Sequence, residues 1–301
     1  MITYLNISLF DSPAQTLVNT VNTVGIMGKG IALVFKKLYP DMFDKYRTLC
    51  LANKFDVGML YVYRTPHKII VNFPTKKHWR NPSQVDFIEA GLKKFVERYQ
   101  DYGISSVSFP QLGCGNGELN WEQQVQPLME RYLQKLPIPV YIHLYSQAPD
   151  FVPERLDRKW AKQMQLEHEQ ISANQLWMDL HKLVHSTGEP SYSLNPSTQV
   201  AIDDEHLCFS FHTQRAIVHR QDVEDLWSIL LQRGAIREND FPQPIREASA
   251  NVHLFDLLRR LAYIKPLTLS TKTAQGLVAY QGLQYAPPPS QDVFLETEVS
   301  V

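Results

Sequence analysis

The fold of the N-terminal half is decided by the stretch Val18-Asn19-Thr20-Val21-Asn22-Thr23-Val24-Gly25-Ile26-Met27-Gly28-Lys29-Gly30-Ile31-Ala32. It reads as an apolar strand that runs into a side-chain amide, a glycine-rich turn and the start of a helix. Gly28 and Gly30 let the main chain approach a ligand without hindrance from a Cβ atom. The free N–H groups at the start of the helical run Ile31–Lys37 favour an anion. Alone, the stretch is weak evidence for a phosphate site.

A second glycine-rich loop follows about 80 residues later, in Gly113-Cys114-Gly115-Asn116-Gly117-Glu118-Leu119-Asn120-Trp121. It also comes after an apolar strand, Val107–Phe109, and it also opens a helix. Two such loops suit a diphosphate.

The segments Val18–Phe35 and Pro110–Trp121 resemble the macrodomain family, the ADP-ribose-binding fold. The resemblance covers about the first half of the chain. Within that family, the combination of Asn19–Asn22, Met27–Gly30 and Phe73–Arg80 is similar to the DarG-type DNA ADP-ribosyl glycohydrolase antitoxins. It also resembles the terminal ADP-ribose glycohydrolases. The resemblance implies ADP-ribosyl-thymidine in single-stranded DNA as the substrate.

Catalytic roles are implied for Lys76 and Asn22. Lys76 stands in a segment that matches the catalytic lysine of the terminal glycohydrolases, which places its amine near the scissile ribose carbon. As a neutral amine it could attack C1″, and as an ammonium it could stabilise the leaving base. The amide of Asn22 suits ribose hydroxyls. From the residues alone, solvent or anion binding by Lys76 and capping of the loop by Asn22 stay open.

The expected ADP-ribose contacts follow the first strand and lie in the two glycine loops: Ser8, Leu9, Asn19, Thr20, Val21, Thr23, Gly28, Lys29, Gly30, Ile31, Ala32, Leu112, Gly113, Cys114, Gly115, Asn116 and Gly117. The expected DNA contacts are Lys77, His78, Trp79 and Arg80. Lys77 is also the second choice for the catalytic lysine, and the aromatic pair suits base stacking or simple packing.

Two positions depart from the family pattern. Macrodomains commonly place an Asp after the first strand for adenine, where this chain has Ser8. The terminal glycohydrolases have an acidic residue in the second loop where Gly117 stands, and the neighbouring Glu118 is out of register. A lysine–carboxylate pair is therefore doubtful. Cys114 lies in a phosphate loop rather than beside a base, which argues against a nucleophilic thiol.

The chain has 301 residues, 44% of them hydrophobic and only 13 glycines, which is enough for two packed domains. Cys50, Cys114 and Cys208 are far apart and odd in number, so we expect no disulfide framework and a reducing cytoplasm. The ten histidines lack ligand spacing, so neither a metal site nor a cofactor is expected. Without a basic leader or an apolar run of about 18 residues, the protein should be soluble and not exported.

Alternating strands and helices predict an α/β first domain, residues 1–150, with the macrodomain three-layer α/β/α arrangement and a mixed sheet. The boundary is placed near 150, where Ser146–Pro153 interrupts the periodicity. The expected strands are Ile2–Leu9, Thr16–Asn22, Met59–Tyr63, Lys68–Phe73, Ser105–Phe109 and Val140–Tyr145, and the expected helices start near Ile31, Met42, Asn81 and Asn120.

Residues 151–301 are predicted to form a smaller α+β domain. Helices are expected at roughly 155–185, 221–234 and 252–263, and strands near 206–212, 215–219 and 276–281. This order is compatible with a winged-helix-like unit, on fold-level analogy alone. The tail from Pro287 reads as extended or mobile.

Charge differs between the halves. Residues 1–150 hold 16 Lys and Arg against 12 Asp and Glu, whereas residues 151–301 hold 14 against 19. Such charges are also typical of an ordinary solvated surface. The resemblance implies that residues 151–301 bind a DarT-like ADP-ribosyltransferase toxin, with the acidic cluster Asp203–Glu205 and anchors around Trp227 on the binding surface. The alternatives are a macrodomain that only reads ADP-ribose, a hydrolase of ADP-ribosyl-protein esters, and a protein that mainly neutralises the toxin.

Overall fold

The structure, a computed structural model, describes residues 2–144, 170–186, 188 and 191–286. They group into two compact units. Unit 1 contains residues 2–144 and Ser270–Val278, and unit 2 contains the described residues from 170 to Leu269 and from Ala279 to 286. The boundary expected near residue 150, the helical segment 155–169 and the tail from Pro287 lie outside the described residues.

Unit 1 is built on a mixed sheet with the strand order β12-β1-β6-β5-β2-β4-β3. The strands from β1 to β4 in this order run parallel, and β3 adds an antiparallel edge. On the side away from β3, Ser270 in β12 (Ile264–Thr273) pairs antiparallel with Tyr4 of β1. The remaining bounds are β1 Ile2–Leu5, β2 Thr16–Asn22, β3 Tyr61–Arg64, β4 Ile69–Lys76, β5 Val107–Pro110 and β6 Val140–His143.

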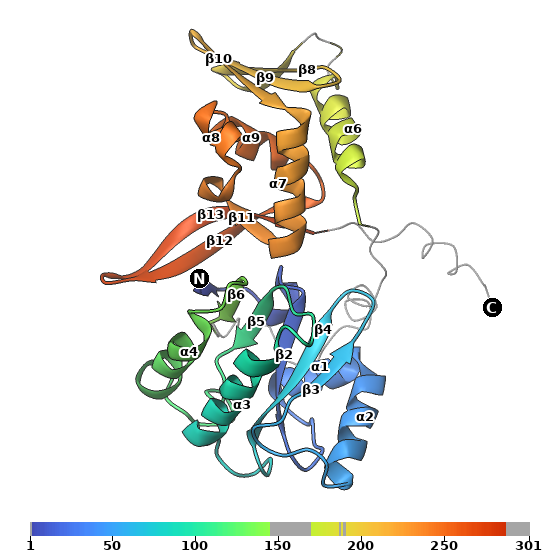
Figure 1. The fold of residues 1–301 in the computed structure, drawn as a ribbon, viewed down its shortest axis with the longest axis vertical. Helices are drawn as coiled ribbons and strands as arrows, with labels where there is room; N and C mark the ends of the chain where they lie inside the picture. The colour runs from blue at the N-terminus through green and yellow to red at the C-terminus, as the bar shows by residue number, and fades with distance from the viewer. Residues whose placement is uncertain (1, 145–169, 187, 189–190, 287–301) are drawn as a thin grey trace, which may run out of the picture. The chain divides into compact units, whose positions relative to one another are not determined.

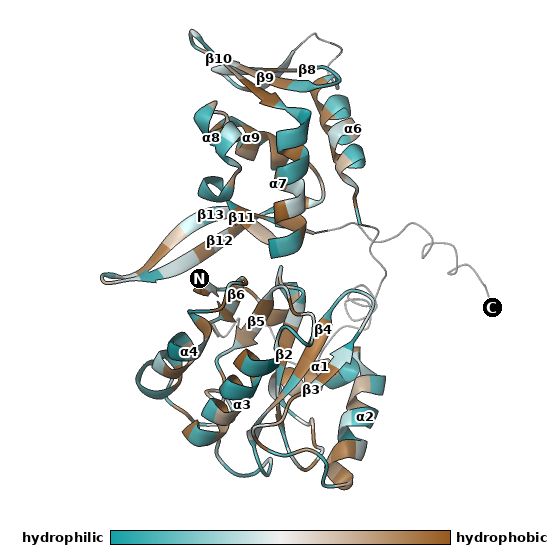
Figure 2. Ribbon diagram, in the orientation of Figure 1, coloured by the Kyte–Doolittle hydropathy of each residue, from teal (hydrophilic) through white to brown (hydrophobic). Residues whose placement is uncertain are grey.

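Helices cover both faces of this sheet (Figure 1). One face carries α1 (Gly30–Leu38) and α2 (Pro40–Leu51), and the other carries α3 (Val85–Arg98) and α4 (Gln126–Leu133), which follows a π-helical turn at Trp121–Val125. The strands are largely hydrophobic, while the helices alternate hydrophobic and hydrophilic residues (Figure 2). The predicted three-layer α/β/α macrodomain arrangement is confirmed.

The apolar spacing of α3 explains its docking. Ile88, Leu92 and Phe95 recur at helical spacing and are fully buried against the sheet. A Cβ atom on Gly91 would lie 2.2 Å from Cζ of Phe73, so the glycine permits close approach of the helix to that ring. The helix therefore packs tightly on β4, the strand that ends at Lys76.

Several element bounds differ from the expectation. The first strand ends at Leu5 instead of Leu9, because the Ser8 hydroxyl accepts a hydrogen bond from the Phe10 N–H (3.3 Å) and starts a 3-10 turn at Leu9–Asp11. The fourth strand continues past Phe73 to Lys76.

Unit 2 has a separate antiparallel sheet with the strand order β10-β9-β8-β7. Its other elements are the helices and a short strand, β11, that pairs with β13. The bounds are β7 Tyr192–Asn195, β8 Thr198–Ile202, β9 His206–Phe211, β10 Gln214–His219, β11 Ala235–Arg237, β13 Gly276–Tyr285, α6 Ala173–Val184, α7 Arg220–Arg233, α8 Gln243–Glu247 and α9 Asn251–Leu258. The unit is α+β as expected, and the winged-helix assignment stays a prediction.

The expectation for Trp227 is wrong. Its side chain is 2% exposed, and its indole N–H donates to the Ile171 carbonyl (2.9 Å). The ring also packs edge-on against Tyr263 and Tyr285. Trp227 is therefore a core residue of unit 2 rather than an exposed anchor. Among the described residues, no helix has the length and apolar character needed to cross a membrane.

Candidate functional site

The two glycine-rich loops lie side by side in the fold. They follow the carboxyl ends of β2 and β5, which are neighbouring parallel strands, and ligands of open α/β sheets bind at such strand ends. A Cβ atom on Gly30 of the first loop would lie 3.1 Å from Nδ2 of Asn116 in the second. The register pairs Asn22 with Lys76 at the ends of β2 and β4. The structure thus brings together both residues predicted as catalytic and both predicted phosphate loops.

Asn22 shapes the first loop. Its Nδ2 donates to the Ile26 carbonyl (2.6 Å), and its Oδ1 accepts from the N–H groups of Val24 (3.1 Å) and Ile26 (3.2 Å). The Tyr46 hydroxyl also donates to the Asn22 carbonyl (2.7 Å). In this structure the amide holds its own loop, which is the structural alternative to ribose binding. Contact of Asn22 with ribose stays a prediction.

Thr23 joins the first loop to the end of β4. Its backbone N–H and its hydroxyl both donate to the Lys77 carbonyl, at 3.2 Å and 2.9 Å. These two hydrogen bonds therefore fix the position of the first loop relative to Lys77, the residue after Lys76.

Both loops offer backbone donors. Within the described residues, the N–H groups of Gly28 and Lys29 meet no protein acceptor, and the same holds for Gly115, Asn116 and Gly117. The first-turn N–H groups of α1 add to these, because a helix cannot pair them internally. Adjacent sets of free N–H groups at a helix N-terminus form an anion site. The arrangement fits a diphosphate.

The glycines of the second loop serve different purposes. A Cβ atom on Gly117 would lie 2.2 Å from the Gly113 carbonyl oxygen and 2.3 Å from Oγ of Ser83, whereas a Cβ atom on Gly115 would meet nothing within 4 Å. The Ser83 N–H also donates to the Gly117 carbonyl (2.9 Å). Ser83 supports the loop from a distant segment, and sequence reasoning missed it because no local pattern marks this contact.

Lys76 joins β4 to the second loop. Its side chain is partly buried, and its Nζ donates to the Asn116 carbonyl. Burial lowers the pKa of Lys76, while the carboxylate of Glu118 acts in the opposite direction. Glu118 adopts a left-handed conformation (φ 65°) in the loop. Although Glu118 is out of register in the sequence, the fold places its charge where Lys76 senses it.

A buried histidine anchors the segment that follows β1. His143 is 5% exposed; its Nδ1 donates to the Ile7 carbonyl (3.0 Å), and its Nε2 accepts from the Ser108 hydroxyl (3.1 Å). Burial lowers the pKa of His143 to about 4, so the ring is neutral. This fixes the chain beside Ser8 and Leu9, the residues expected near adenine. Ser8 caps its own turn, and Leu9 is buried.

Other expected contacts are less accessible. Asn19 is fully buried and its Nδ2 donates to Oδ1 of Asn72 (2.9 Å). Leu112 and Val21 are also buried, so they can meet a ligand only through the main chain. Burial raises the pKa of Cys114 to about 12, which keeps the thiol protonated and unreactive. Residues with more access are Thr20, Ile31 and Ala32, which are half-buried, and Lys29, which is exposed.

An exposed stack of side chains follows Lys76. The rings of His78 and Trp79 lie 5.6 Å apart at an interplanar angle of 27°, and the Arg80 guanidinium lies 4.6 Å from the Trp79 ring centre. Trp79 is 45% exposed. Lys77 is exposed as well, with its Nζ 6.0 Å from the Phe87 ring. A cationic aromatic surface beside the strand end is suited to nucleic acid, and its use stays a prediction.

The comparisons with known proteins agree with this fold. The family model for the Macro domain matches residues 18–128. The match lies within unit 1, whose fold is that of a macrodomain. The chain is 44% identical over 153 residues to a DNA ADP-ribosyl glycohydrolase of Thermus aquaticus, and this match covers 50% of this chain and 42% of that protein.

Two further relatives are similar. A DNA ADP-ribosyl transferase-DNA ADP-ribosyl glycohydrolase fusion protein of Thermosipho africanus is 40% identical over 163 residues, which covers 47% of this chain and 42% of the relative. The solved macrodomain of Mycobacterium tuberculosis DarG is 43% identical, with a TM-score of 0.46, and the match covers 48% of this chain and 99% of that one. The matches cover less than half the length of these two curated relatives.

Proposed function

We propose that this chain is a DNA ADP-ribosyl glycohydrolase that releases ADP-ribose from modified thymidine in single-stranded DNA. The names of the relatives from Thermus aquaticus and Thermosipho africanus support this activity. The observation that carries the proposal is the position of Lys76, whose amine lies at the end of β4, opposite Asn22 and against the second glycine loop. A module that only reads ADP-ribose needs no amine at that point.

The proposed reaction is a hydrolysis. With the diphosphate on the free N–H groups of both loops, the distal ribose extends toward Asn22 and Lys76. The bond between C1″ and the base nitrogen breaks, its electron pair stays with the base, and water supplies a hydroxyl to C1″ and a proton to that nitrogen. Lys76 acts either by attack on C1″ as a neutral amine or by stabilising charge as an ammonium.

The test is the release of ADP-ribose from an ADP-ribosylated oligonucleotide. Lys76→Ala should lower turnover by about 100-fold or more, while ADP-ribose affinity measured by calorimetry changes by less than about threefold. A group that acts mainly on the transition state has this effect. Lys77→Ala is the matched control, because it removes the neighbouring exposed amine. Normal turnover in both variants would exclude a lysine mechanism, and loss in Lys77→Ala alone would move the assignment by one residue.

The two roles of Lys76 also give different outcomes. Lys76→Arg keeps a positive charge but removes the nucleophilic amine, so it should retain activity only if Lys76 acts electrostatically. Treatment with cyanoborohydride during turnover should trap ADP-ribose on Lys76 only if the amine attacks carbon.

The choice of substrate distinguishes the proposed activity from its two alternatives, a reader of ADP-ribose and a hydrolase of ADP-ribosyl-protein esters. A reader of ADP-ribose would bind the nucleotide and release nothing from DNA. A hydrolase of protein esters would act on ADP-ribosylated protein and leave ADP-ribosylated DNA intact. Assays of both substrates with the same preparation of the 301-residue chain distinguish these two activities from the proposed one.

Residues 151–301 are proposed to bind a DarT-like toxin. The surplus of acidic residues in this half and the fusion of the two activities in the Thermosipho relative, as its name states, support this role. Asp204 and Glu205 are exposed in the turn between β8 and β9, whereas the side chain of Asp203 accepts from the Glu205 N–H (2.8 Å). The three cysteines are free, which is compatible with action in the cytoplasm.

Charge reversal tests this surface. The variant Asp204→Lys with Glu205→Lys should slow association with the toxin at low salt, because rim charges mainly set the on-rate. Glu247→Lys on α8 is the control for a charge change elsewhere in unit 2. Unchanged association in the double variant would remove the turn from the binding surface.

A further inference from the structure

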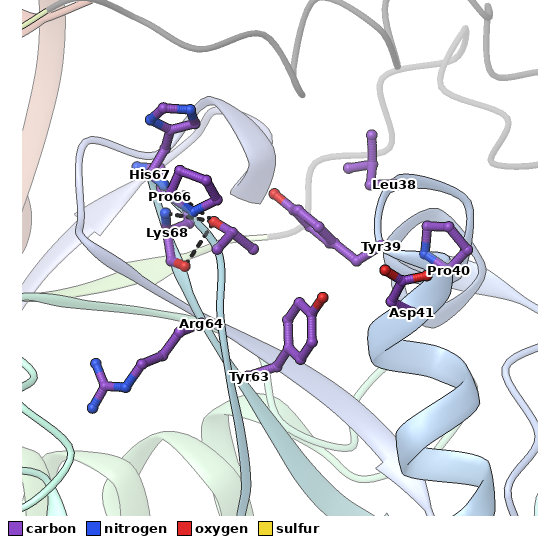
Figure 3. A pocket seen from close by; sticks show the side chains of 10 residues that line it. Leu38, Tyr39, Pro40, Asp41, Tyr63, Arg64, Pro66, His67 and Lys68 are labelled. Carbon is purple, nitrogen blue, oxygen red and sulfur yellow. Dashed lines mark hydrogen bonds between the residues drawn. The ribbon is translucent and has the colours of Figure 1, made fainter.

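The outer edge of β3 carries two hollows in unit 1. One, with a volume of about 340 Å³, lies between the start of α2 and the turn that joins β3 to β4 (Figure 3). The other, of about 550 Å³, continues along β3 and shares Tyr63 and Arg64 with the first. Both volumes are in the range of ligand pockets. The residues that matter here, called the β3 strip, are Tyr39, Lys45, Tyr61, Tyr63, Arg64 and Tyr102.

The tyrosine side chains of the β3 strip have polar groups that the fold leaves open to a ligand. Tyr61 and Tyr63 point to the same side of β3 because side chains alternate along a strand. Tyr39 and Tyr63 turn their hydroxyls toward the same open space in Figure 3. Among the described residues, none of the four tyrosine hydroxyls of the strip has a hydrogen-bond partner. Partly buried tyrosines usually find such a partner, so these groups are available to a ligand.

The charges around the hollows favour an anion. The Lys45 ammonium lies 5.4 Å from the Tyr63 ring centre, and the exposed Arg64 side chain is oriented by its bond to the Tyr102 carbonyl (2.7 Å). Lys68 also lines the first hollow, but its ammonium is buried and bonded to the carbonyls of Ser12 (3.1 Å) and Ala14 (2.5 Å), so the argument for an anion rests on Lys45 and Arg64. Asp41 is the one carboxylate among the lining residues that the structure describes for both hollows.

We propose that the β3 strip binds single-stranded DNA on the flank of the modified nucleotide. Cations interleaved with aromatic rings are the recognition surface for single strands, because the cations pair with phosphates and the rings stack on unpaired bases. A duplex would keep its bases from these hollows. The inference rests on the proposed function for the identity of the nucleic acid, and it adds a contact surface separate from Lys77–Arg80.

The register of the sheet connects the strip to the site. Tyr61 pairs with Asn72 of β4, and Arg64 pairs with Ile69. Asn72 precedes Lys76 by four residues, so the strip begins about 13 Å from Lys76 along the strand direction and runs away from it. A DNA strand that presents its modified nucleotide to Lys76 can therefore continue along β3.

The first experiment measures binding of a fluorescent, unmodified oligothymidine to the full chain at several salt concentrations. The variant Lys45→Gln with Arg64→Gln should weaken binding about tenfold and reduce the slope of log K against log salt by about 1.4, which corresponds to two lost phosphate contacts on a single strand. The matched control, Lys93→Gln with Lys135→Gln, removes two exposed charges of the same unit and should change the affinity by less than about twofold.

Two outcomes of that measurement would overturn the proposal. One is equal affinity in the two double variants. The other is no binding of the oligonucleotide to the wild-type chain at 50 mM salt, where phosphate contacts are stronger than at physiological salt. An extended peptide added to the β3 edge would be the alternative occupant in that case, because main-chain pairing does not depend on these charges.

A second experiment locates the DNA directly. Photo-crosslinking with an oligonucleotide that contains bromodeoxyuridine should give adducts on the peptide with Tyr61 and Tyr63. Adducts confined to Lys77–Arg80 would refute a path along β3.

Turnover separates this inference from the proposed function. The Lys45→Gln, Arg64→Gln variant should hydrolyse an ADP-ribosylated thymidine mononucleotide normally and show a raised KM on a long oligonucleotide. If the wild-type chain hydrolyses neither substrate, the proposed activity fails, while the binding and crosslinking results still decide whether the strip holds DNA. An equal KM on the oligonucleotide for variant and wild type would refute the strip.

Discussion

Replacing glycines of the second loop should separate folding from ligand binding. At Gly117, a methyl group would lie 2.2 Å from the Gly113 carbonyl oxygen and 2.3 Å from Oγ of Ser83. The nearer obstacle is backbone, which cannot rotate away as a flexible side chain can. At Gly115, a methyl group would meet no protein atom within 4 Å. We therefore predict that Gly117→Ala destabilises the protein and that Gly115→Ala does not.

The expected magnitudes follow from these contacts. Overpacking of a tight site costs about 1–3 kcal/mol, and the contact with backbone places Gly117→Ala near the upper end, at about 3 kcal/mol. For a unit of roughly 150 residues, the size of unit 1, that corresponds to a decrease in Tm of about 6–12 °C. Gly115→Ala should leave Tm unchanged or slightly raised, because alanine reduces the conformational entropy of the unfolded chain. Its methyl group would instead enter the space proposed for the diphosphate, and ADP-ribose affinity should fall at least tenfold.

The measurements are thermal unfolding and calorimetric titration with ADP-ribose, made on both variants of the 301-residue chain. The reasoning about the loop would be refuted if Gly117→Ala unfolds at the wild-type temperature. The assignment of the diphosphate to this loop would be refuted if Gly115→Ala, folded and stable, binds ADP-ribose as the wild type does.

Three other predictions follow from single contacts. Burial lowers the pKa of His143 to about 4, so between about pH 6.5 and pH 4 the unfolded chain binds a proton that the folded chain does not. The free energy of unfolding should therefore fall by about 3 kcal/mol as the pH drops through that window. The prediction is contradicted if the urea midpoint of the wild type decreases with pH no more than that of His143→Gln. Cys114, with its pKa raised to about 12 by burial, should react with iodoacetamide far more slowly at pH 8 than a free thiol, as mass spectrometry can measure. Trp227→Ala should lower the free energy of unfolding of unit 2 by about 3–5 kcal/mol, since the variant leaves a cavity and an unpaired Ile171 carbonyl. A loss smaller than about 1 kcal/mol in urea titrations would contradict this assignment of Trp227 to the core.

The fold of unit 1 was predictable because its signals are local. The strand Thr16–Asn22 and the helix that follows Gly28 and Gly30 occur where the pattern of apolar residues and glycines indicates them. Asn120 caps its helical turn as expected, with Oδ1 accepting from the Gln123 N–H (2.8 Å). The residues that determine each of these elements lie within the element or directly beside it in the sequence.

Long-range contacts set the limit of that prediction. The sequence alone shows neither the support of Gly117 by Ser83 nor the effect of Glu118 on Lys76, since both depend on how loops fold back on each other. In unit 2, β7, β8, β11 and α8 were not expected, because strands of three to five residues and a five-residue helix carry weak periodicity. The ten-residue strand β12 was not expected either. The expectation for Trp227 was wrong for a related reason. A tryptophan on an amphipathic helix has the same sequence pattern whether it packs in the core of its own domain or against another protein.

The hydrogen bond between Lys76 and the Asn116 carbonyl has a consequence for the direction in which the amine points. The bond uses one donor of the amine and couples the direction of Lys76 to the conformation of the second loop. A lysine ammonium has three donors, so two stay open to a ligand, and a neutral amine keeps its lone pair while it donates. Under the proposed function, a substrate that shifts the second loop would therefore also redirect the amine.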